Sequence, residues 1–182
     1  MNAIRKVYLD NAATTPVRKE VVDVMSAVLL EHFGNPSSTH SFGRSAKTQL
    51  ETARKTIAKL LHANASEILF TSTATEATNW ILRSAVRDLG VKRIITTKTE
   101  HHATLHTVTV LEREFGINVT FLPINTDGSV QISDLPELLE QPIKTLVSLI
   151  HVNNESGEIQ DIQQVAQWCQ TYEAYFHCDT VQ

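Results

Sequence analysis

Polar side chains with catalytic or ligand-binding chemistry follow three short apolar runs of the sequence. His101 stands just after one run, Asn154 just after another, and Asp179 directly after a third. Parallel strands bring their carboxyl ends to one edge of a sheet, where open α/β sheets bind ligands, so these side chains are expected to converge. An imidazole can stack on a flat ligand, a carboxamide can donate to an oxyanion, and a carboxylate can pair with a cationic nitrogen. A single Asp or Asn after a strand is equally typical of a turn, so the prediction depends on the convergence.

A turn that could bind an anion is a second candidate. The segment Ser72-Thr73-Ala74-Thr75-Glu76 precedes a helical pattern. The first backbone N–H groups of a helix attract anions, and phosphate above all. Thr73 and Glu76 also have the spacing of a capping box, which needs no ligand. The residues alone leave both interpretations open.

Metal and thiol chemistry receive less support. His102 and His106 share one helical pattern, but no third ligand follows at a suitable spacing, so no metal site is expected. Cys169 and Cys178, without a secretory signal, indicate free thiols in a reducing compartment. Both are interpreted as buried packing residues, because a free cysteine behaves as a small hydrophobic side chain.

The elements that must position these residues alternate along the chain. Five strands are expected, at Ile68–Thr71, Arg93–Thr97, Val119–Leu122, Leu146–Ile150 and Tyr175–Cys178. Four helices are expected between them, at Thr75–Leu89, His102–Phe115, Ile132–Leu139 and Ile162–Tyr172. Alternating strands and helices indicate an α/β fold with a mainly parallel sheet flanked by helices.

The first third of the chain has a different pattern. A short strand is expected at Val7–Leu9, followed by an amphipathic helix from Val17 to Phe33. The turn formers of Gly34–Ser38 separate this helix from a second one. The inward residues of the second helix are expected to be Ala46, Leu50, Ala53, Ile57, Leu60 and Leu61. An N-terminal helical segment therefore precedes the sheet.

Composition argues against several function classes. The chain has 182 residues, a net charge of -4 and no stripe of Lys and Arg, so no nucleic-acid partner is expected. No apolar run reaches the length of a membrane span, and the N-terminus lacks the pattern of a signal peptide. No membrane partner is expected, and the sequence predicts a cytoplasmic protein.

Six blocks of sequence carry a resemblance to a known family. They are Tyr8-Leu9-Asp10-Asn11-Ala12-Ala13-Thr14-Thr15-Pro16, Gly34-Asn35-Pro36-Ser37-Ser38 with His40, Phe70-Thr71-Ser72-Thr73-Ala74-Thr75-Glu76, Thr99-Glu100-His101, His151-Val152-Asn153-Asn154-Glu155, and His177-Cys178-Asp179-Thr180-Val181-Gln182. In this order and spacing the chain resembles the cysteine desulfurases, which are aminotransferase class V enzymes of pyridoxal-phosphate fold-type I. The resemblance implies that residues 16–182 are the first, incomplete part of a large domain that binds pyridoxal 5'-phosphate (PLP). Residues 1–15 would belong with the small domain.

The resemblance also implies how the cofactor would be held. It assigns cofactor binding to Ala74, Thr75, His101, Asn154, Asp179 and Gln182. Ala74 and Thr75 would hold the phosphate at the helix start. His101 would stack on the pyridine ring as a catalytic residue, and Asp179 would pair with the ring nitrogen. The two amides would contact the phenolic oxygen or the substrate carboxylate side, which makes Asn154 a substrate-binding residue as well.

The activity implied by the resemblance is removal of sulfur from L-cysteine, which gives L-alanine and an enzyme persulfide for iron–sulfur cluster assembly. Family members carry the cofactor-binding lysine, the nucleophilic cysteine and a substrate-binding arginine beyond the point that corresponds to Gln182. The chain is therefore expected to be an N-terminal fragment, inactive by itself. Its expected partners are L-cysteine in the complete enzyme, a missing C-terminal half or second chain, a homodimer mate, and a scaffold or sulfur-acceptor protein.

Two departures and two alternatives accompany this interpretation. The family usually has Gly where Thr73 stands, and a Cβ there could strain the turn if its φ were positive. The family's sheet has seven strands, and its order would cut the strand expected at Ile68–Thr71 off from the other four. A solitary monomer is therefore expected to be unstable.

The alternatives are a selenocysteine lyase or another class V enzyme, and a non-catalytic shortened protein that binds a partner.

Overall fold

The computed structural model describes residues 6–182, which divide into two compact units. The first unit runs up to Phe70, and the second is Thr71–Gln182. The second unit holds the sheet and all the residues with predicted roles at the site.

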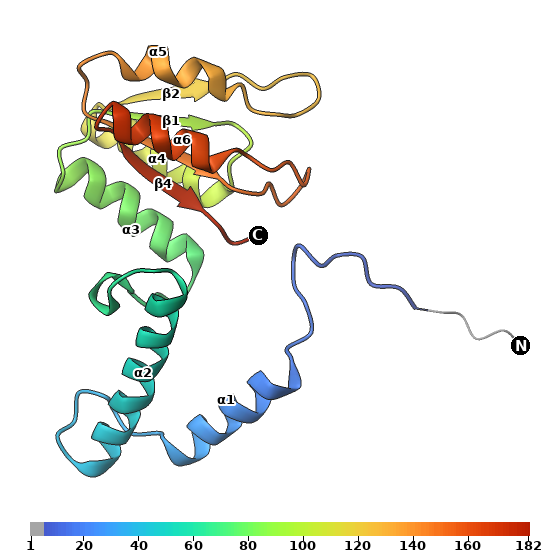
Figure 1. Ribbon diagram of the computed structural model, residues 1–182, viewed down its shortest axis with the longest axis vertical. Coiled ribbons are helices and arrows are strands. Elements are labelled where there is room, and N and C mark those ends of the chain that lie inside the picture. Colours follow the sequence, from blue (N-terminus) through green and yellow to red (C-terminus); the bar gives the residue numbers. More distant parts are fainter. Residues whose placement is uncertain (1–5) are drawn as a thin grey trace, which may run out of the picture. The chain divides into compact units, whose positions relative to one another are not determined.

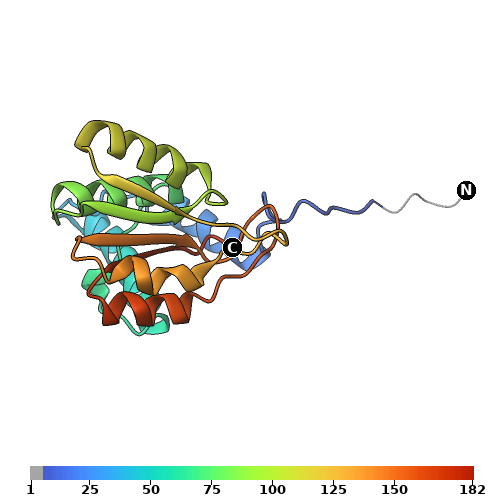
Figure 2. The ribbon, with the colours of Figure 1, turned by 90° about the horizontal axis from the view of Figure 1, so that it is seen from above.

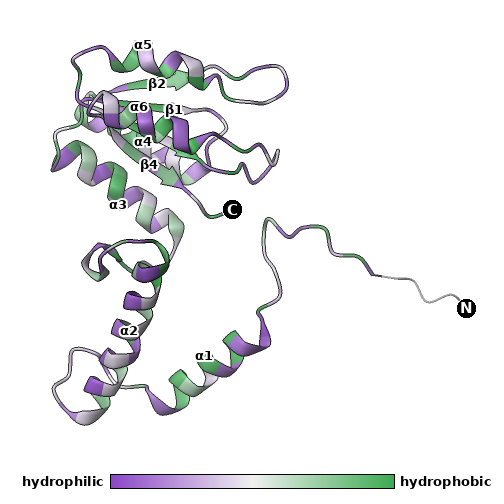
Figure 3. Cartoon of the chain, viewed as in Figure 1, coloured by the Kyte–Doolittle hydropathy of each residue, from purple (hydrophilic) through white to green (hydrophobic). Residues whose placement is uncertain are grey.

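The first unit is helical, as predicted. It contains α1 (Lys19–Glu31), α2 (Ser41–Leu60) and the short 3-10 helix η1 (Ala65–Glu67). Both predicted helices are confirmed. His40 caps α2 through its Nδ1, which accepts the N–H of Gly43 at 3.3 Å. Figure 3 shows apolar and polar residues interspersed along α1, none of which is buried.

Two strands predicted in this part of the chain are wrong. Residues 7–9 are not in a strand, and Leu9 is 86% exposed. The backbone around Ile68 makes other bonds: its N–H donates to Ala65 O at 3.3 Å, and its carbonyl oxygen accepts from Arg54 Nε at 3.2 Å. Apolar runs alone therefore do not make a strand here, because a strand needs a neighbour for its backbone groups.

The second unit contains a four-stranded parallel sheet. Its strands are β1 (Arg93–Thr97), β2 (Asn118–Leu122), β3 (Thr145–Ile150) and β4 (Tyr175–Asp179), in the order β2-β1-β3-β4 (Figure 1). All four strands were predicted, whereas the fifth expected strand is absent from the described residues. The α/β fold class is confirmed.

Helices cover both faces of the sheet (Figure 2). They are α3 (Ala74–Arg87), α4 (His102–Phe115), α5 (Leu135–Leu139), preceded by the 3-10 helix η2 (Ile132–Asp134), and α6 (Ile162–Thr171). Neighbouring residues of β1 point to opposite faces: Ile94 packs in a core with side chains of α3 and α4, and Ile95 in a core with side chains of α5 and α6. The central strands β1 and β3 are buried along their whole length, which explains their consecutive apolar residues, whereas the edge strands β2 and β4 are only partly buried.

The strand order creates a topological switch point between β1 and β3. The chain leaves β1 through α4 to reach β2, and then crosses through α5 to β3 on the other side of β1. The loops that follow β1 and β3 therefore diverge at the carboxyl edge of the sheet. Open α/β sheets bind ligands in the crevice at such a point.

No helix among residues 6–182 combines the length and the hydropathy that a membrane crossing requires. Within the same residues, no three His, Cys, Asp or Glu side chains come together as a metal-binding group. Both cysteines are free thiols, Cys169 buried and Cys178 half-buried.

Candidate functional site

The start of α3 combines a helix cap with free backbone amides. Thr73 Oγ1 accepts the N–H of Glu76 at 3.1 Å, and Glu76 Oε2 accepts from the N–H and the hydroxyl of Ser72 at 2.7 and 2.6 Å. The hydrogen bonds from Ser72 lower the pKa of Glu76. The N–H groups of Ala74 and Thr75 lie in the first turn, where no intrahelical acceptor exists. The cap is therefore compatible with an anion at the same turn.

Thr73 causes no backbone strain at this turn. Its φ is -150° and its ψ is 159°, an extended conformation that any L-residue adopts. Thr73 stands where the family usually has glycine, and its negative φ shows that the turn does not require glycine here.

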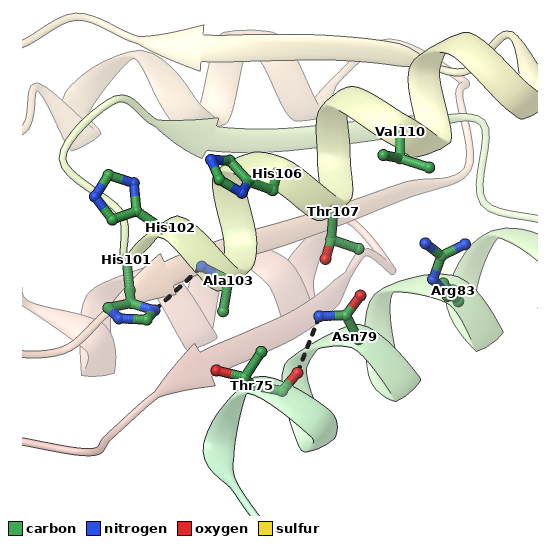
Figure 4. Close-up of a pocket in the computed structure, with 9 residues that line it drawn as sticks. All are labelled: Thr75, Asn79, Arg83, His101, His102, Ala103, His106, Thr107 and Val110. Atoms are coloured by element: carbon green, nitrogen blue, oxygen red, sulfur yellow. Dashed lines mark hydrogen bonds between the residues drawn. The ribbon is translucent and has the colours of Figure 1, made fainter.

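His101 is the N-cap residue of α4. Its Nδ1 accepts the N–H of Ala103 at 3.1 Å, so the neutral imidazole carries its proton on Nε2. The side chain is exposed, and it lines a hollow of about 310 Å³ between α3 and α4 together with Thr75. Figure 4 shows His101 and Thr75 at one end of this hollow, with Arg83 further along α3. The structure thus brings the candidate stacking residue close to the candidate phosphate turn.

A second hollow, of about 360 Å³, lies at the switch point between β1 and β3. His101 lines this hollow as well, and faces it together with Asn154 from the loop after β3. Asn154 is half-buried, and its Nδ2 donates to Glu155 Oε1 at 3.0 Å. His101 therefore joins the two hollows.

Asp179 ends β4 and is 7% exposed. Its Oδ1 accepts the N–H of Val181 at 3.2 Å. It lines a third hollow, of about 240 Å³, together with Ala74 of α3. His177 lies in the same hollow and contacts Ser148 Oγ through Nδ1 at 2.9 Å. Burial lowers the pKa of His177, which disfavours the charged form of its imidazole.

Five of the six predicted residues are divided among these three hollows at the carboxyl edge of the sheet. Thr75 shares one hollow with His101, Asn154 shares a second with His101, and Ala74 shares a third with Asp179. Gln182 is exposed at the end of the chain and lines none of these three.

Two buried polar residues, Glu100 and Asn153, lie beside the site, and neither is among the predicted site residues. Glu100 is 5% exposed, and its Oε1 accepts the N–H of Ile150 at 2.7 Å. Burial, assisted by the negative charge of Asp179, raises the pKa of Glu100 to about 8. Asn153 is 7% exposed, and its Nδ2 donates to Thr99 O at 2.6 Å. Both residues belong to the conspicuous blocks Thr99-Glu100-His101 and Asn153-Asn154-Glu155, but the direction of a loop side chain cannot be predicted from its position in such a block.

These residues fit a flat ligand that carries a phosphate and a protonated ring nitrogen. The first-turn amides of α3 suit a phosphate, the exposed imidazole of His101 suits a ring face, and the buried carboxylate of Asp179 suits a cationic nitrogen. Pyridoxal 5'-phosphate has all three features. The donor set of the chain is therefore compatible with this cofactor.

Fold and site together define an α/β protein with an open parallel sheet and a ligand crevice at its switch point. The chain belongs to the aminotransferase class-V family, whose sequence profile matches residues 7–182. It is 46% identical over 180 residues to a cysteine desulfurase IscS of Dictyoglomus turgidum, and 44% identical over 181 residues to one of Methanosarcina thermophila. Each alignment covers 98% of this chain but only 45% and 44% of the relative, so the chain spans less than half of their length.

Solved structures of similar proteins share the fold of this chain, which again covers only about half of each of them. A NifS-like protein superposes with a TM-score of 0.92 at 38% identity, covering 98% of this chain and 49% of that protein. A structure described as SspA in complex with cysteine superposes with a TM-score of 0.89 at 33% identity, covering 96% of this chain and 50% of that protein. The pyridoxal-phosphate fold-type I architecture predicted from the sequence is confirmed for the part that the chain supplies.

Proposed function

We propose that this chain is the N-terminal part of a PLP-dependent cysteine desulfurase. The whole enzyme would remove sulfur from L-cysteine and give L-alanine and an enzyme persulfide for iron–sulfur cluster assembly. The observation that carries the proposal is the position of His101, which faces Thr75 in one hollow and Asn154 in the next. The relatives named cysteine desulfurase, and the similar protein solved with cysteine, support the choice of reaction.

Each side chain of the site has a role in this proposal. Ala74 and Thr75 would bind the cofactor phosphate through the first-turn amides of α3, and His101 would stack on the pyridine ring. Asp179 would hold a proton on the ring nitrogen, because its buried carboxylate favours a cationic partner. PLP, when bound, supplies an acceptor for the electrons of the substrate's α-carbon.

Two amides complete the proposed site. Asn154 and Gln182 would orient the phenolic oxygen, and Asn154 would also orient the substrate carboxylate. In the structure the Nδ2 of Asn154 donates to Glu155, so cofactor binding would exchange this exposed contact for a ligand contact.

The rest of the enzyme is proposed to come from sequence that follows the family pattern beyond Gln182, in the same chain or in a second one. It would supply the lysine that binds PLP covalently, the nucleophilic cysteine and the small domain, with which residues 1–15 would pack. Cys169 and Cys178 do not serve as the nucleophile in this proposal, because burial raises the pKa of each to about 11 and the thiolate is the reactive form. We place the enzyme in the cytoplasm as a homodimer that delivers sulfur to a scaffold or acceptor protein.

The activity is tested on the complete enzyme, by measuring alanine release from L-cysteine and from L-selenocysteine. We expect release from cysteine, and a loss of about 100-fold or more for Asp179→Ala, because the ring nitrogen loses its partner. Thr109→Ala, on the exposed face of α4, is the control and should leave the rate unchanged. Release from selenocysteine alone would instead assign a selenocysteine lyase, and release from neither would contradict the proposal.

The missing lysine is tested on the 182-residue chain. The chain is incubated with PLP, reduced with borohydride and weighed by mass spectrometry. We expect no stoichiometric cofactor adduct. A single lysine modified in full yield would show that the covalent residue lies within this sequence.

A further inference from the structure

At the switch point, the carboxyl ends of β1 and β3 are linked by side chains, because the backbone pairing of the two strands stops before it. The ladder between the two strands ends at the pair Ile95 and Val147, although β3 continues to Ile150. Beyond this pair, two buried side chains, Glu100 and Asn153, cross from one loop to the other. The carboxyl ends of the strands are therefore linked without closing the crevice between them.

Glu100 crosses from the loop after β1 to the backbone of β3. Its Oε1 accepts the N–H of Ile150 at 2.7 Å, whereas the next amide, that of His151, donates to Asp179 O on β4 at 2.8 Å. The carboxyl group thus takes the place of the backbone acceptor that β1 no longer offers. Because Glu100 is only 5% exposed, water does not readily replace it as the partner of this amide.

Asn153 crosses in the opposite direction. Its Nδ2 donates to Thr99 O at 2.6 Å, and its Oδ1 accepts the N–H groups of Glu155 and Ser156 at 2.9 and 2.8 Å. One carboxamide therefore fixes both its own turn and the turn that leads into His101. With an exposure of 7%, Asn153 is as enclosed as Glu100.

We infer that Glu100 and Asn153 form a reciprocal clasp that positions His101 and Asn154, the residues that follow each of them. His101 follows Glu100 in the chain, and Asn154 follows Asn153. Because Glu100 and Asn153 are buried and hydrogen-bonded, the backbone of the residue after each has little freedom. The clasp therefore sets the direction in which the side chains of His101 and Asn154 leave their loops. The clasp stands on its own contacts, whereas its importance for PLP depends on the proposed function. Both members are positioning residues, because they act through their neighbours.

The charges around Glu100 are consistent with this arrangement. Asp179 and Cys178 of β4 are the ionisable groups that act on it or respond to it. The Oε2 atom of Glu100 is buried and makes no hydrogen bond of normal geometry among the described residues, and the nearby Thr104 hydroxyl lowers the pKa of Glu100 by less than burial raises it. The pKa of about 8 keeps Glu100 largely protonated at neutral pH.

Amide hydrogen exchange on the 182-residue chain tests the clasp without any ligand. The Ile150 amide should exchange at least about tenfold faster in Glu100→Ala than in the wild type. Glu100→Gln keeps an acceptor oxygen and should retain the protection, and the Val147 amide should be unchanged in both variants. Equal protection of Ile150 in Glu100→Ala would overturn the clasp.

Equilibrium dialysis with pyridoxal 5'-phosphate tests the positioning role. Asn153→Asp keeps the acceptor Oδ1 and removes the donor, so we expect its Kd for PLP to rise about tenfold, and that of Glu100→Gln to change less than about threefold. Val165→Ala, on the buried face of α6, is the control for lost stability alone. If Val165→Ala weakens binding as much as Asn153→Asp does, the positioning role is contradicted.

The remaining outcomes separate the clasp from the proposed function. If Glu100→Ala does not fold, the comparison is made between Asn153→Asp and Glu100→Gln, which replace single side-chain groups. Faster exchange at the Thr99 turn is then expected for Asn153→Asp only. If the wild type does not bind PLP while Ile150 exchanges as expected, the proposed cofactor is wrong and the clasp stands. Unaltered exchange in both Glu100→Ala and Asn153→Asp would reject the clasp whatever binds in the crevice.

Discussion

At the scale of single residues, the buried carboxyl of Glu100 links the stability of the fold to pH. Burial raises its pKa from 4.5 to about 8, so between these values the folded chain holds a proton that the unfolded chain releases. The stabilising effect is complete below about pH 4.5 and is lost as the pH rises through 8. We expect urea unfolding to show the wild type losing at least about 2 kcal/mol relative to Glu100→Gln between pH 5 and pH 9.

The comparison with Glu100→Gln isolates this effect from other titrating groups. Burial lowers the pKa of His177, which therefore acts with the opposite sign: its contribution is present above the ordinary value of 6.5 and is lost at lower pH. His177 is common to both proteins, so its effect largely cancels in the difference. Parallel stability curves for the two proteins would show that Glu100 is ionised in the fold.

At the scale of elements, the cap of α3 is a local device whose effect can be measured. Thr73→Ala removes the acceptor of the Glu76 N–H and should lower the free energy of unfolding by about 1 kcal/mol, within the usual range for caps. Thr109→Ala is the matched control, because its hydroxyl donates to Leu105 O in the middle of α4 and caps nothing. We expect the control to be neutral or slightly stabilising in thermal unfolding, since alanine favours a helix. Equal losses in both variants would contradict the capping role.

Some strands of the fold could be predicted from the sequence, and others could not. β1 and β3 were predictable, because strands covered on both faces carry apolar side chains at consecutive positions, as in Ile94-Ile95 and Leu146-Val147. Residues 7–9 and 68–71 were mistaken for strands, because an apolar pattern does not reveal whether a neighbouring strand exists to satisfy the backbone. The position of His101 after β1 followed from strand alternation, whereas the inward direction of Glu100 depends on contacts across the switch point that no local pattern encodes.

At the scale of the whole molecule, the first unit leaves an unusual amount of apolar surface in solvent. None of the α1 residues is buried, and Met25 and Leu29 are 55% and 72% exposed. Large apolar side chains exposed in this way on a folded chain favour association. We expect the 182-residue chain to form dimers or larger species in sedimentation velocity runs at about 0.1 mM, and to dissociate when Met25 and Leu29 are both replaced by Gln.

The control for this prediction lies on the polar surface of α2. Lys55→Gln changes an exposed side chain without altering the apolar surface, so it should sediment as the wild type does. Adding the remaining part of the enzyme should suppress self-association if that part covers α1, because the same side chains cannot contact two partners at once. The prediction is contradicted if the wild-type chain remains monomeric at this concentration and has the same far-ultraviolet circular dichroism as the double variant. The apolar side chains of α1 would then not cause self-association.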